Sequence, residues 1–245
     1  MSVWAILAVF AVLLVLEERH RPAASSAVAW SRLGVNWGLG LINIGLIALA
    51  PVAALTAAAL SRGGPLAELG AIAAFGPFLL ARSFAAYWLH RLFHSVPWLW
   101  RIHRVHHGDR EIDTSTGLRN HPLEAVAAAG CAAVVVALLG APVGAVVAVD
   151  ALLFAAALWQ HAAIPVPPRA AGLAEWLLVT PRTHLIHHSP QRIEHDRNYG
   201  DLLTLWDRAF GTYTPPLPAP TAIGLDDESV QPDSLPAQLL LPFRP

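Results

Sequence analysis

Five apolar stretches divide the chain, and charged or histidine-rich segments separate them. The stretches cover residues 3–16, 33–60, 71–89, 125–139 and 143–158. Because a helix needs about 20 apolar residues to cross a bilayer, these lengths predict helices that span the membrane or dip deeply into it. Gly140, Ala141 and Pro142 separate the last two stretches and predict a tight turn between antiparallel helices. The pattern therefore predicts an all-α integral membrane bundle of about four to five apolar helices.

The two ends of the chain depart from this apolar middle. No basic residue precedes the first stretch and charged residues follow it, which is opposite to a cleaved signal peptide, so we expect a retained helix. Pro51 in the second stretch predicts a kink or a break. From Pro215 onward the chain is proline-rich and polar, which predicts a surface tail or a poorly ordered extension. The expected units are N-terminal membrane helices (1–70), a central domain (71–214) and a proline-rich C-terminal tail (215–245).

Composition supports a membrane protein and excludes several other classes. Hydrophobic residues make up 55% of the 245 positions and charged residues only 13%, whereas soluble domains carry about 25% charged residues. A formal net charge of −1 gives no reason to expect a nucleic-acid partner. The single cysteine, Cys131, excludes a cysteine-ligated cluster or zinc finger within this chain.

The distribution of arginine predicts the orientation in the membrane. Arginines gather between the first and second stretches, between the third and fourth, and after the fifth, whereas Arg62 alone lies on the other side. Basic residues favour the cytoplasmic face, so we expect the N-terminus outside and the C-terminus in the cytoplasm. Abundant arginine and alanine indicate a bacterial source, and hence the cell (inner) membrane. The same topology places all histidine clusters in a helical cap on the cytoplasmic side.

Three histidine clusters carry the main chemical signal. Residues three or four apart share a face of a helix, so we expect the histidines within each cluster to point the same way. Neutral imidazole is a common metal ligand that suits iron, copper, nickel or zinc. Eight imidazoles exceed the needs of one ion, which predicts two metal ions with open positions. The clusters are His90 and His94, then His103, His106 and His107, then His184, His187 and His188.

The order and spacing of these motifs resemble the fatty acid hydroxylase/sterol desaturase superfamily. The resemblance covers roughly Ser83 to Tyr213 and rests on the three clusters with their flanking residues, together with Arg119–Glu124, Asn198–Gly200 and Leu205–Tyr213. It implies that residues 71–214 form a catalytic domain of a membrane di-iron oxygenase, which oxidises lipids with O2 and supplied electrons. The chemistry implied is carried by the metal ligands, with no further catalytic residue.

The resemblance also assigns individual residues. It implies the eight clustered histidines as ligands, and Trp159-Gln160-His161 suggests His161 as a ninth. For His121 a role at the metal site and a structural contact in a loop stay equally open, and we expect His195 to be a solvated loop residue. Carboxylates usually orient ligating histidines; among Asp109, Asp113, Glu124, Asp196, Asp201 and Asp207, Asp196 lies nearest the third cluster and is favoured, together with Asn198.

Two ionisable residues fall inside apolar stretches, where an unpaired charge is costly. Arg82 precedes His90 by eight residues and Asp150 precedes His161 by eleven, so both lie on the order of 12–16 Å below the metal level. The matched depth predicts that they pair with each other; the alternative is a polar end to a substrate cavity. Most tryptophans are expected in the interfacial belt, namely Trp98, Trp100, Trp159, Trp176 and Trp206.

The favoured function is an O2-dependent hydroxylase or desaturase of a membrane lipid, with a sterol-like or fatty acyl substrate. The chain has no GxGxxG motif, so electrons would come from a separate ferredoxin or cytochrome with its reductase. Arginines of the cytoplasmic face could dock such a partner or simply follow the positive-inside rule (Arg91, Arg101, Arg104, Arg110 and Arg192). The alternatives are a zinc-dependent lipid hydrolase, which needs neither O2 nor electrons, and a non-catalytic metal-binding membrane protein.

Overall fold

The computed structural model describes residues 3–20, 27–49, 63–216, 222–226 and 234–244. These ranges are mostly helical, and the β-structure they contain is one isolated bridge between Leu178 and Leu203. The helices are α1 (Val3–Glu18), α2 (Ala27–Leu49), α4 (Ala71–Ser95), α5 (Pro97–His107), η1 (Thr114–Leu118), α6 (Pro122–Leu139), α7 (Val143–His161), α8 (Pro168–Leu177), α9 (Pro181–His187), α10 (Arg192–His195), α11 (Leu205–Ala209), α12 (Leu235–Leu240) and η3 (Leu241–Phe243).

Three described helices, α4, α6 and α7, are long and apolar enough to cross a membrane. The chain is therefore a helical membrane protein, as predicted, and the described residues contain fewer qualifying helices than the four to five expected. α1 is shorter, with 16 residues. The second apolar stretch forms α2 up to Leu49, whereas the position of the expected kink at Pro51 lies outside the described residues.

The predicted hairpin between α6 and α7 is confirmed. α6 ends at Gly140, which has a φ of +64° in the left-handed region that favours glycine. Pro142 then caps the start of α7. A Cβ atom on Gly140 would lie 2.5 Å from the Gly63 carbonyl oxygen, so the turn also needs glycine for its close approach to the 63–64 segment.

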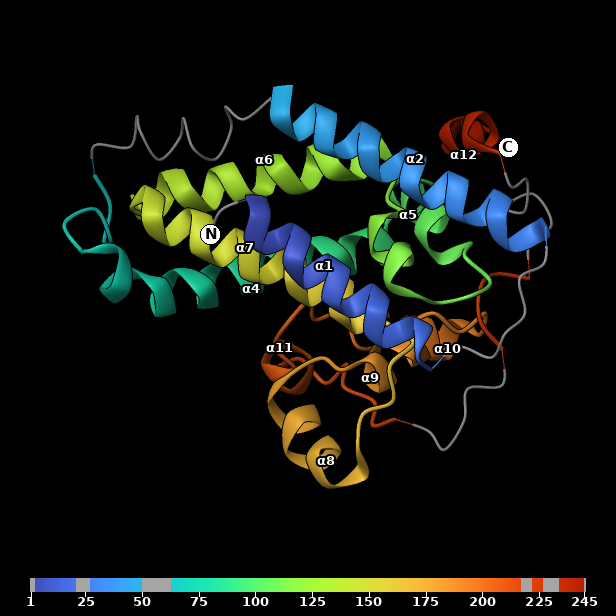
Figure 1. The fold of residues 1–245 in the computed structure, drawn as a ribbon. Coiled ribbons are helices and arrows are strands. Elements are labelled where there is room, and N and C mark those ends of the chain that lie inside the picture. The colour runs from blue at the N-terminus through green and yellow to red at the C-terminus, as the bar shows by residue number, and fades with distance from the viewer. Residues whose placement is uncertain (1–2, 21–26, 50–62, 217–221, 227–233, 245) are drawn as a thin grey trace.

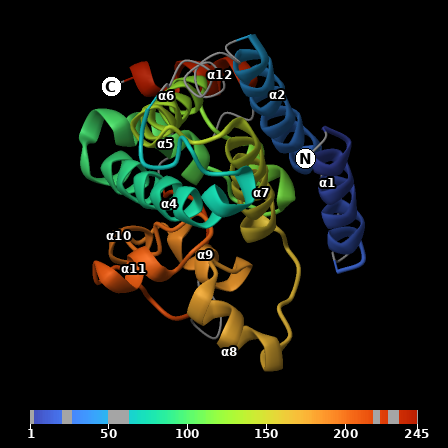
Figure 2. The same cartoon turned by 90° about the vertical axis from the view of Figure 1, so that its left-hand side faces the viewer.

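The membrane helices pack around one apolar core. Its buried members include Phe78 of α4, Val136 of α6 and Val149 of α7. α4 packs on both α6 and α7, while α1 packs on α7 and α2 packs on α6 (Figure 1). The segment from α8 to α11 lies on one side of this bundle in both views (Figures 1 and 2). The histidines of α9 thus reach the ends of α4, α5 and α7 from that side.

A buried polar network anchors the loop that follows α5. Arg32 of α2 donates a hydrogen bond to Asp109 at 2.9 Å and forms an ion pair with Asp113. Asn36 and Thr116 donate to the same Asp109 carboxylate at 2.9 and 2.8 Å. Buried charges persist when they are paired and hydrogen-bonded. Arg32, one of the arginines between the first and second apolar stretches, therefore lies in α2 and joins it to the loop beside the second histidine cluster.

Arg82 and Asp150 form the predicted ion pair. Arg82 Nε lies 3.3 Å from Asp150 Oδ1, which joins α4 to α7 below the histidines. Leu202 and Leu203 of the cap pack against the same apolar core. Between them and Tyr199 stands Asp201, whose carboxyl has its pKa raised to about 6 by burial, while the nearby positive charge of Arg82 acts in the opposite direction.

The C-terminal residues differ from the expected surface tail. α12 and η3 pack on α2 and α5, and Leu241 is fully buried beside Val35, Leu39 and Val105. The Leu241 carbonyl accepts a hydrogen bond from Arg104 at 3.0 Å. The polar, proline-rich composition concealed a short apolar helix, because few hydrophobic residues suffice when they fill a gap between two existing helices.

Candidate metal centre

The three histidine clusters lie near the ends of α4, α5 and α9, which meet in one region. His90 and His94 occupy the last turns of α4, and the chain turns at Val96 into α5, which begins with Pro97 and presents the second cluster. α9 carries the third cluster and starts with a capping box, in which the side chains of Thr180 and Thr183 each accept from the other residue's backbone N–H. A proline fits the first position of each of these short helices because its missing N–H would have no helical partner there.

The nine expected ligands fall into two groups. Within each group the possible ligand atoms lie within 4.8 Å of one another. Group one combines the α4 pair with residues of α5 and α9, and group two combines α5, α7 and α9. Group one is His90, His94, His103, His107 and His187, and group two is His106, His161, His184 and His188.

Each three-histidine cluster divides between the groups. His103 and His107, four residues apart, turn to group one, whereas His106 turns to group two. On α9 the i,i+4 pair (His184 and His188) turns to group two and His187 to group one. The first histidine of each cluster shares a face with the other two, as expected, with ring centroids 4.8 to 5.3 Å apart. The rings on that one face nevertheless belong to two groups. Each of the two helices contributes to both groups.

Hydrogen bonds fix the protonation of the group-one rings. The Nδ1 atoms of His90 and His187 lie 2.8 and 2.7 Å from the carbonyl oxygens of Tyr199 and Arg197. A carbonyl can only accept, so each Nδ1 carries the proton and each Nε2 keeps a lone pair. His103 Nδ1 donates likewise to Glu124 at 2.9 Å.

These lone pairs converge on a common point. His90 Nε2 lies 3.1 Å from His103 Nε2 and 3.0 Å from His187 Nε2. None of the three atoms has a proton to share, so the contacts are not hydrogen bonds. Two nitrogens about 2.1 Å from a shared metal ion and at right angles to it are about 3.0 Å apart. The spacing therefore fits ligation of one cation.

Group two shows the same convergence. His161 Nδ1 donates to the Ala157 carbonyl, which leaves a lone pair on Nε2. That Nε2 lies 2.9 Å from His184 Nε2 and 3.1 Å from the Nε2 atoms of both His106 and His188. Four rings from three helices thus aim the same atom at one place.

Burial keeps the rings neutral and leaves some nitrogens without partners. In the described part of the chain, His94 Nε2 and both ring nitrogens of His107 are buried without a hydrogen bond, a costly state that a cation would relieve. Desolvation, with a smaller effect of neighbouring imidazoles, holds several pKa values far below the usual range, so these rings offer lone pairs rather than protons. This applies to His106, His107, His184, His187 and His188.

One short segment, residues 196–199, contacts the Nδ1 atoms of three group-one rings. Besides the two carbonyls already described, Asp196 Oδ1 lies 3.3 Å from His94 Nδ1. The segment 196–199 therefore orients His90, His94 and His187. Asp196 was expected beside the third cluster, but its ring contacts are with His94 and, at 3.9 Å, His195. Backbone carbonyls have no sequence signature, so these partners could not be predicted.

Three other expected residues have different surroundings. His121 lies outside both groups; its ring accepts from the Leu123 N–H and contacts the Leu239 carbonyl, which favours the structural alternative. His195 is buried and stacks on Trp100 with ring centroids 5.1 Å apart, so the expectation of a solvated residue was wrong. Asn198 bonds to the backbone of Thr183 and Thr214 and steadies the loop that precedes Tyr199.

The hydrogen bond between His103 and Glu124 allows a test of how such partners stabilise the metal site. Glu124→Ala removes the acceptor for His103 Nδ1, so we expect metal affinity to fall by about ten- to hundredfold. The measurement is metal retained during titration with a chelator. Glu175→Ala is the matched control, because Glu175 is also a buried carboxylate but pairs with Arg182 instead of a histidine. Equal metal loss in both variants would contradict the assigned role.

Comparisons with known proteins agree with this geometry. A family model for fatty acid hydroxylases matches residues 75–212. The ornithine lipid hydroxylase OlsE of Rhizobium tropici is 31% identical over 67% of this chain and 49% of its own length. Alkylglycerol monooxygenases of Homo sapiens and Danio rerio are 31% and 33% identical over 55% and 53% of the chain, but only 29% and 28% of their own lengths. The chain thus spans about half the length of the first relative and under a third of the others. No solved structure matches it.

Proposed function

The chain belongs to the fatty acid hydroxylase family, and from this membership we propose that it is an O2-dependent lipid hydroxylase whose two histidine groups hold a pair of iron ions. The relatives with the printed names hydroxylase and monooxygenase support this reaction class. Insertion of a hydroxyl group takes one oxygen atom from O2 and reduces the other to water, with two electrons and two protons supplied.

The observation that carries the proposal is the convergence of unprotonated Nε2 atoms at two adjacent places. Nine neutral imidazoles suit iron, and a redox-active ion pair would supply the activation of O2 that oxidation of a C–H bond requires. A hydrolytic zinc site typically takes three protein ligands and a water. The five and four rings of this site therefore favour the oxygenase over the hydrolase.

The protein's own residues would orient the site and keep it dry. Hydrogen bonds to Tyr199, Arg197, Glu124 and Ala157 hold four rings with Nε2 pointing inward. His107, His187 and His188 have no exposed surface. This burial excludes water and limits leakage of a reactive oxidant into side reactions.

The membrane helices would present the substrate. The site stands at the ends of α4 and α7, directly above the apolar parts of helices that can span the bilayer. We infer that a lipid is the substrate and that the site faces the cytoplasm of a bacterial cell membrane, as the arginine distribution indicates. A separate electron-transfer protein, a ferredoxin or a cytochrome with its reductase, would supply the electrons.

Isotope labelling tests the reaction class. Lipids are extracted from the source organism and from a strain that lacks the gene, each grown under isotopically heavy oxygen gas. We expect a hydroxylated lipid in the parent strain alone, with the heavy isotope in the new hydroxyl group. A product labelled from heavy water instead would support the hydrolase. Unchanged lipids in the presence of air would remove the main support for both enzymes.

Metal analysis tests the cofactor separately. Protein purified without oxygen should contain about two iron ions per chain, because the ligands form two groups. Zinc in both groups of a preparation that is active without O2 would contradict the proposal.

A further inference from the structure

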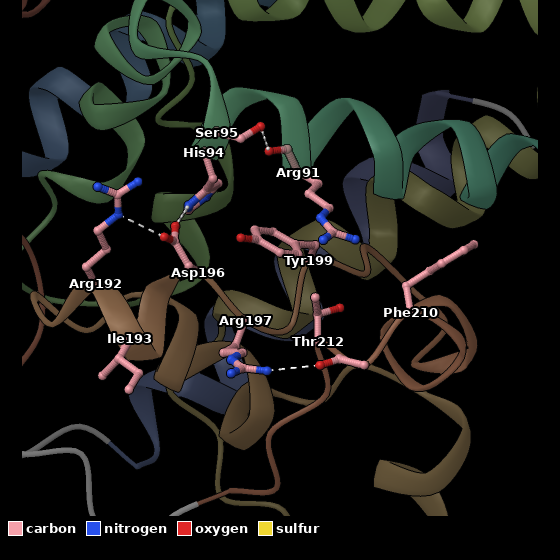
Figure 3. Close-up of a pocket in the computed structure, with 11 residues that line it drawn as sticks. Arg91, His94, Ser95, Arg192, Ile193, Asp196, Arg197, Tyr199, Phe210 and Thr212 are labelled. Atoms are coloured by element: carbon pink, nitrogen blue, oxygen red, sulfur yellow. Dashed lines mark hydrogen bonds and ion pairs between the residues drawn. The ribbon is translucent and has the colours of Figure 1, made fainter.

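A pocket of about 640 Å³ lies directly outside group one (Figure 3). Its wall includes His94 and the segment that carries Asp196, Arg197 and Tyr199. This is the segment that orients three of the group-one rings, so an occupant of the pocket would contact the supports of the metal centre. The volume is in the range of small-molecule sites, about 300–1,000 Å³, and the pocket is open to its surroundings on one side.

The pocket carries an excess of positive charge. Arg91 of α4, Arg192 of α10 and Arg197 line it from three parts of the chain. Arg192 pairs with Asp196 at 3.0 Å. Among the described residues, no carboxylate forms an ion pair with Arg91 or Arg197; Arg91 donates to the Tyr87 hydroxyl at 3.3 Å and Arg197 to the Gly211 carbonyl at 2.9 Å. Guanidinium groups bind phosphate and carboxylate through paired N–H donors.

An apolar stripe leads from the membrane to this pocket. Phe84, Trp88 and Arg91 follow a four- and three-residue spacing, which places them along one face of the spanning helix α4. Phe210 of the pocket packs on this stripe, with its ring centroid 5.0 Å from that of Trp88 and 6.2 Å from that of Phe84. The Arg91 guanidinium stands 5.2 Å over the Trp88 ring. Apolar rings thus give way to positive charge near the end of α4.

Exposed apolar residues continue this surface beside the pocket. Leu173 and Trp176 of α8 are 74% and 61% exposed. Thr204, next to α11, donates to the Trp176 carbonyl at 2.7 Å, which holds α8 against α11. Short helices with apolar and aromatic residues on their outer face are typical of the membrane interface. α8 therefore fits a place at the bilayer surface, and it is joined to α11, which is followed directly by Phe210 of the pocket.

From this arrangement we propose that the pocket binds the anionic head group of a membrane lipid, a phosphate or a carboxylate, whose chain lies along Phe84, Trp88 and Phe210. Arg91 and Arg197 bind the anion, and Arg192 adds charge at the rim. A free anion would not cover the apolar stripe, so the stripe favours a lipid over a free anion as the occupant. Binding of this lipid does not require the proposed oxygenase activity, so it can be measured separately from the reaction.

The test uses the full chain in a neutral detergent with short-chain probes. These are dioctanoyl phosphatidic acid, an N-octanoyl amino acid, neutral dioctanoylglycerol and inorganic phosphate, with binding measured by native mass spectrometry and calorimetry. We expect an anionic lipid to bind, and Arg91→Gln/Arg197→Gln to weaken its binding by about tenfold or more. The control is Arg110→Gln, an exposed arginine outside the pocket, which should leave binding unchanged. If the double variant fails to fold, Arg192→Gln alone, at a largely exposed side chain, should still weaken binding measurably.

Several results would overturn the proposal. Equal loss for anionic and neutral lipids would mean that the arginines act on the fold. Loss of binding in Arg110→Gln would mean that only overall charge matters. Inorganic phosphate that binds as tightly as the lipid probes would assign the pocket to a soluble anion. Unchanged lipid binding, together with slower reduction by an acidic ferredoxin, would assign these arginines to a protein partner.

Discussion

His161→Ala should weaken metal binding in group two and lower the metal content by up to about one ion per chain, because the group loses one of its four rings. His161 contributes the Nε2 atom that lies within 3.1 Å of the three other group-two Nε2 atoms. We expect formation of the hydroxylated lipid to fall by about a hundredfold or more, since loss of a ligand exceeds the ten- to hundredfold cost of losing a ligand's hydrogen-bond partner. Metal analysis of purified protein and lipid analysis of a complemented deletion strain measure the two effects.

His121→Ala is the control for this variant. His121 is also buried, but it caps α6 and lies outside both groups. We expect both metal ions to be kept and stability to fall by about 1 kcal/mol from the lost cap. A His161→Ala protein with a full metal complement would contradict the assignment of group two.

Arg82→Gln should destabilise the membrane bundle by about 2–3 kcal/mol. The substitution leaves the carboxylate of Asp150 without its cation inside an apolar layer, and it removes the positive charge of Arg82 that favours the charged form of Asp201. Because burial raises the pKa of Asp201 to about 6, this carboxyl is charged above that pH and neutral below it. The loss of stability that comes from Asp201 should therefore be present at pH 7.5 and should shrink as the pH falls below about 6. Thermal unfolding in detergent measures the change.

A double-mutant cycle isolates the ion pair. Arg82→Gln/Asp150→Asn leaves two neutral amide side chains, so it should be more stable than Arg82→Gln alone. If the second substitution adds its full cost to the first, the two side chains do not stabilise each other.

Helical spacing and depth could be read from the sequence because both follow from a regular backbone. The i,i+4 spacing of His90 and His94 places them in one group, and the matched depth of Arg82 and Asp150 brings them to 3.3 Å. The tight turn at Gly140 to Pro142 is equally local. Each of these predictions needed only the rise and turn of a helix and the length of a spanning segment.

Features that depend on how distant segments meet could not be predicted in this way. Sequence spacing places His106 on the same face of α5 as His103, and their rings lie 5.3 Å apart, yet the two rings belong to different groups because histidines of α4, α7 and α9 meet them there. Glu124 was one of six acidic candidates, and only packing of α6 against α5 brings it to His103. His195 was expected in solvent but is covered by Trp100, and the last described residues form a helix because α2 and α5 leave room for it.

The position of α9 sets an order for assembly. Group one needs His187, and group two needs His184 and His188, so neither group is complete until the ribosome has passed these late residues. By then α4, α6 and α7, the described helices that can cross the bilayer, have already been synthesised. Metal capture by the proposed site would therefore be a final step in biogenesis that follows insertion, and it would join the cap to a membrane anchor that is already in place.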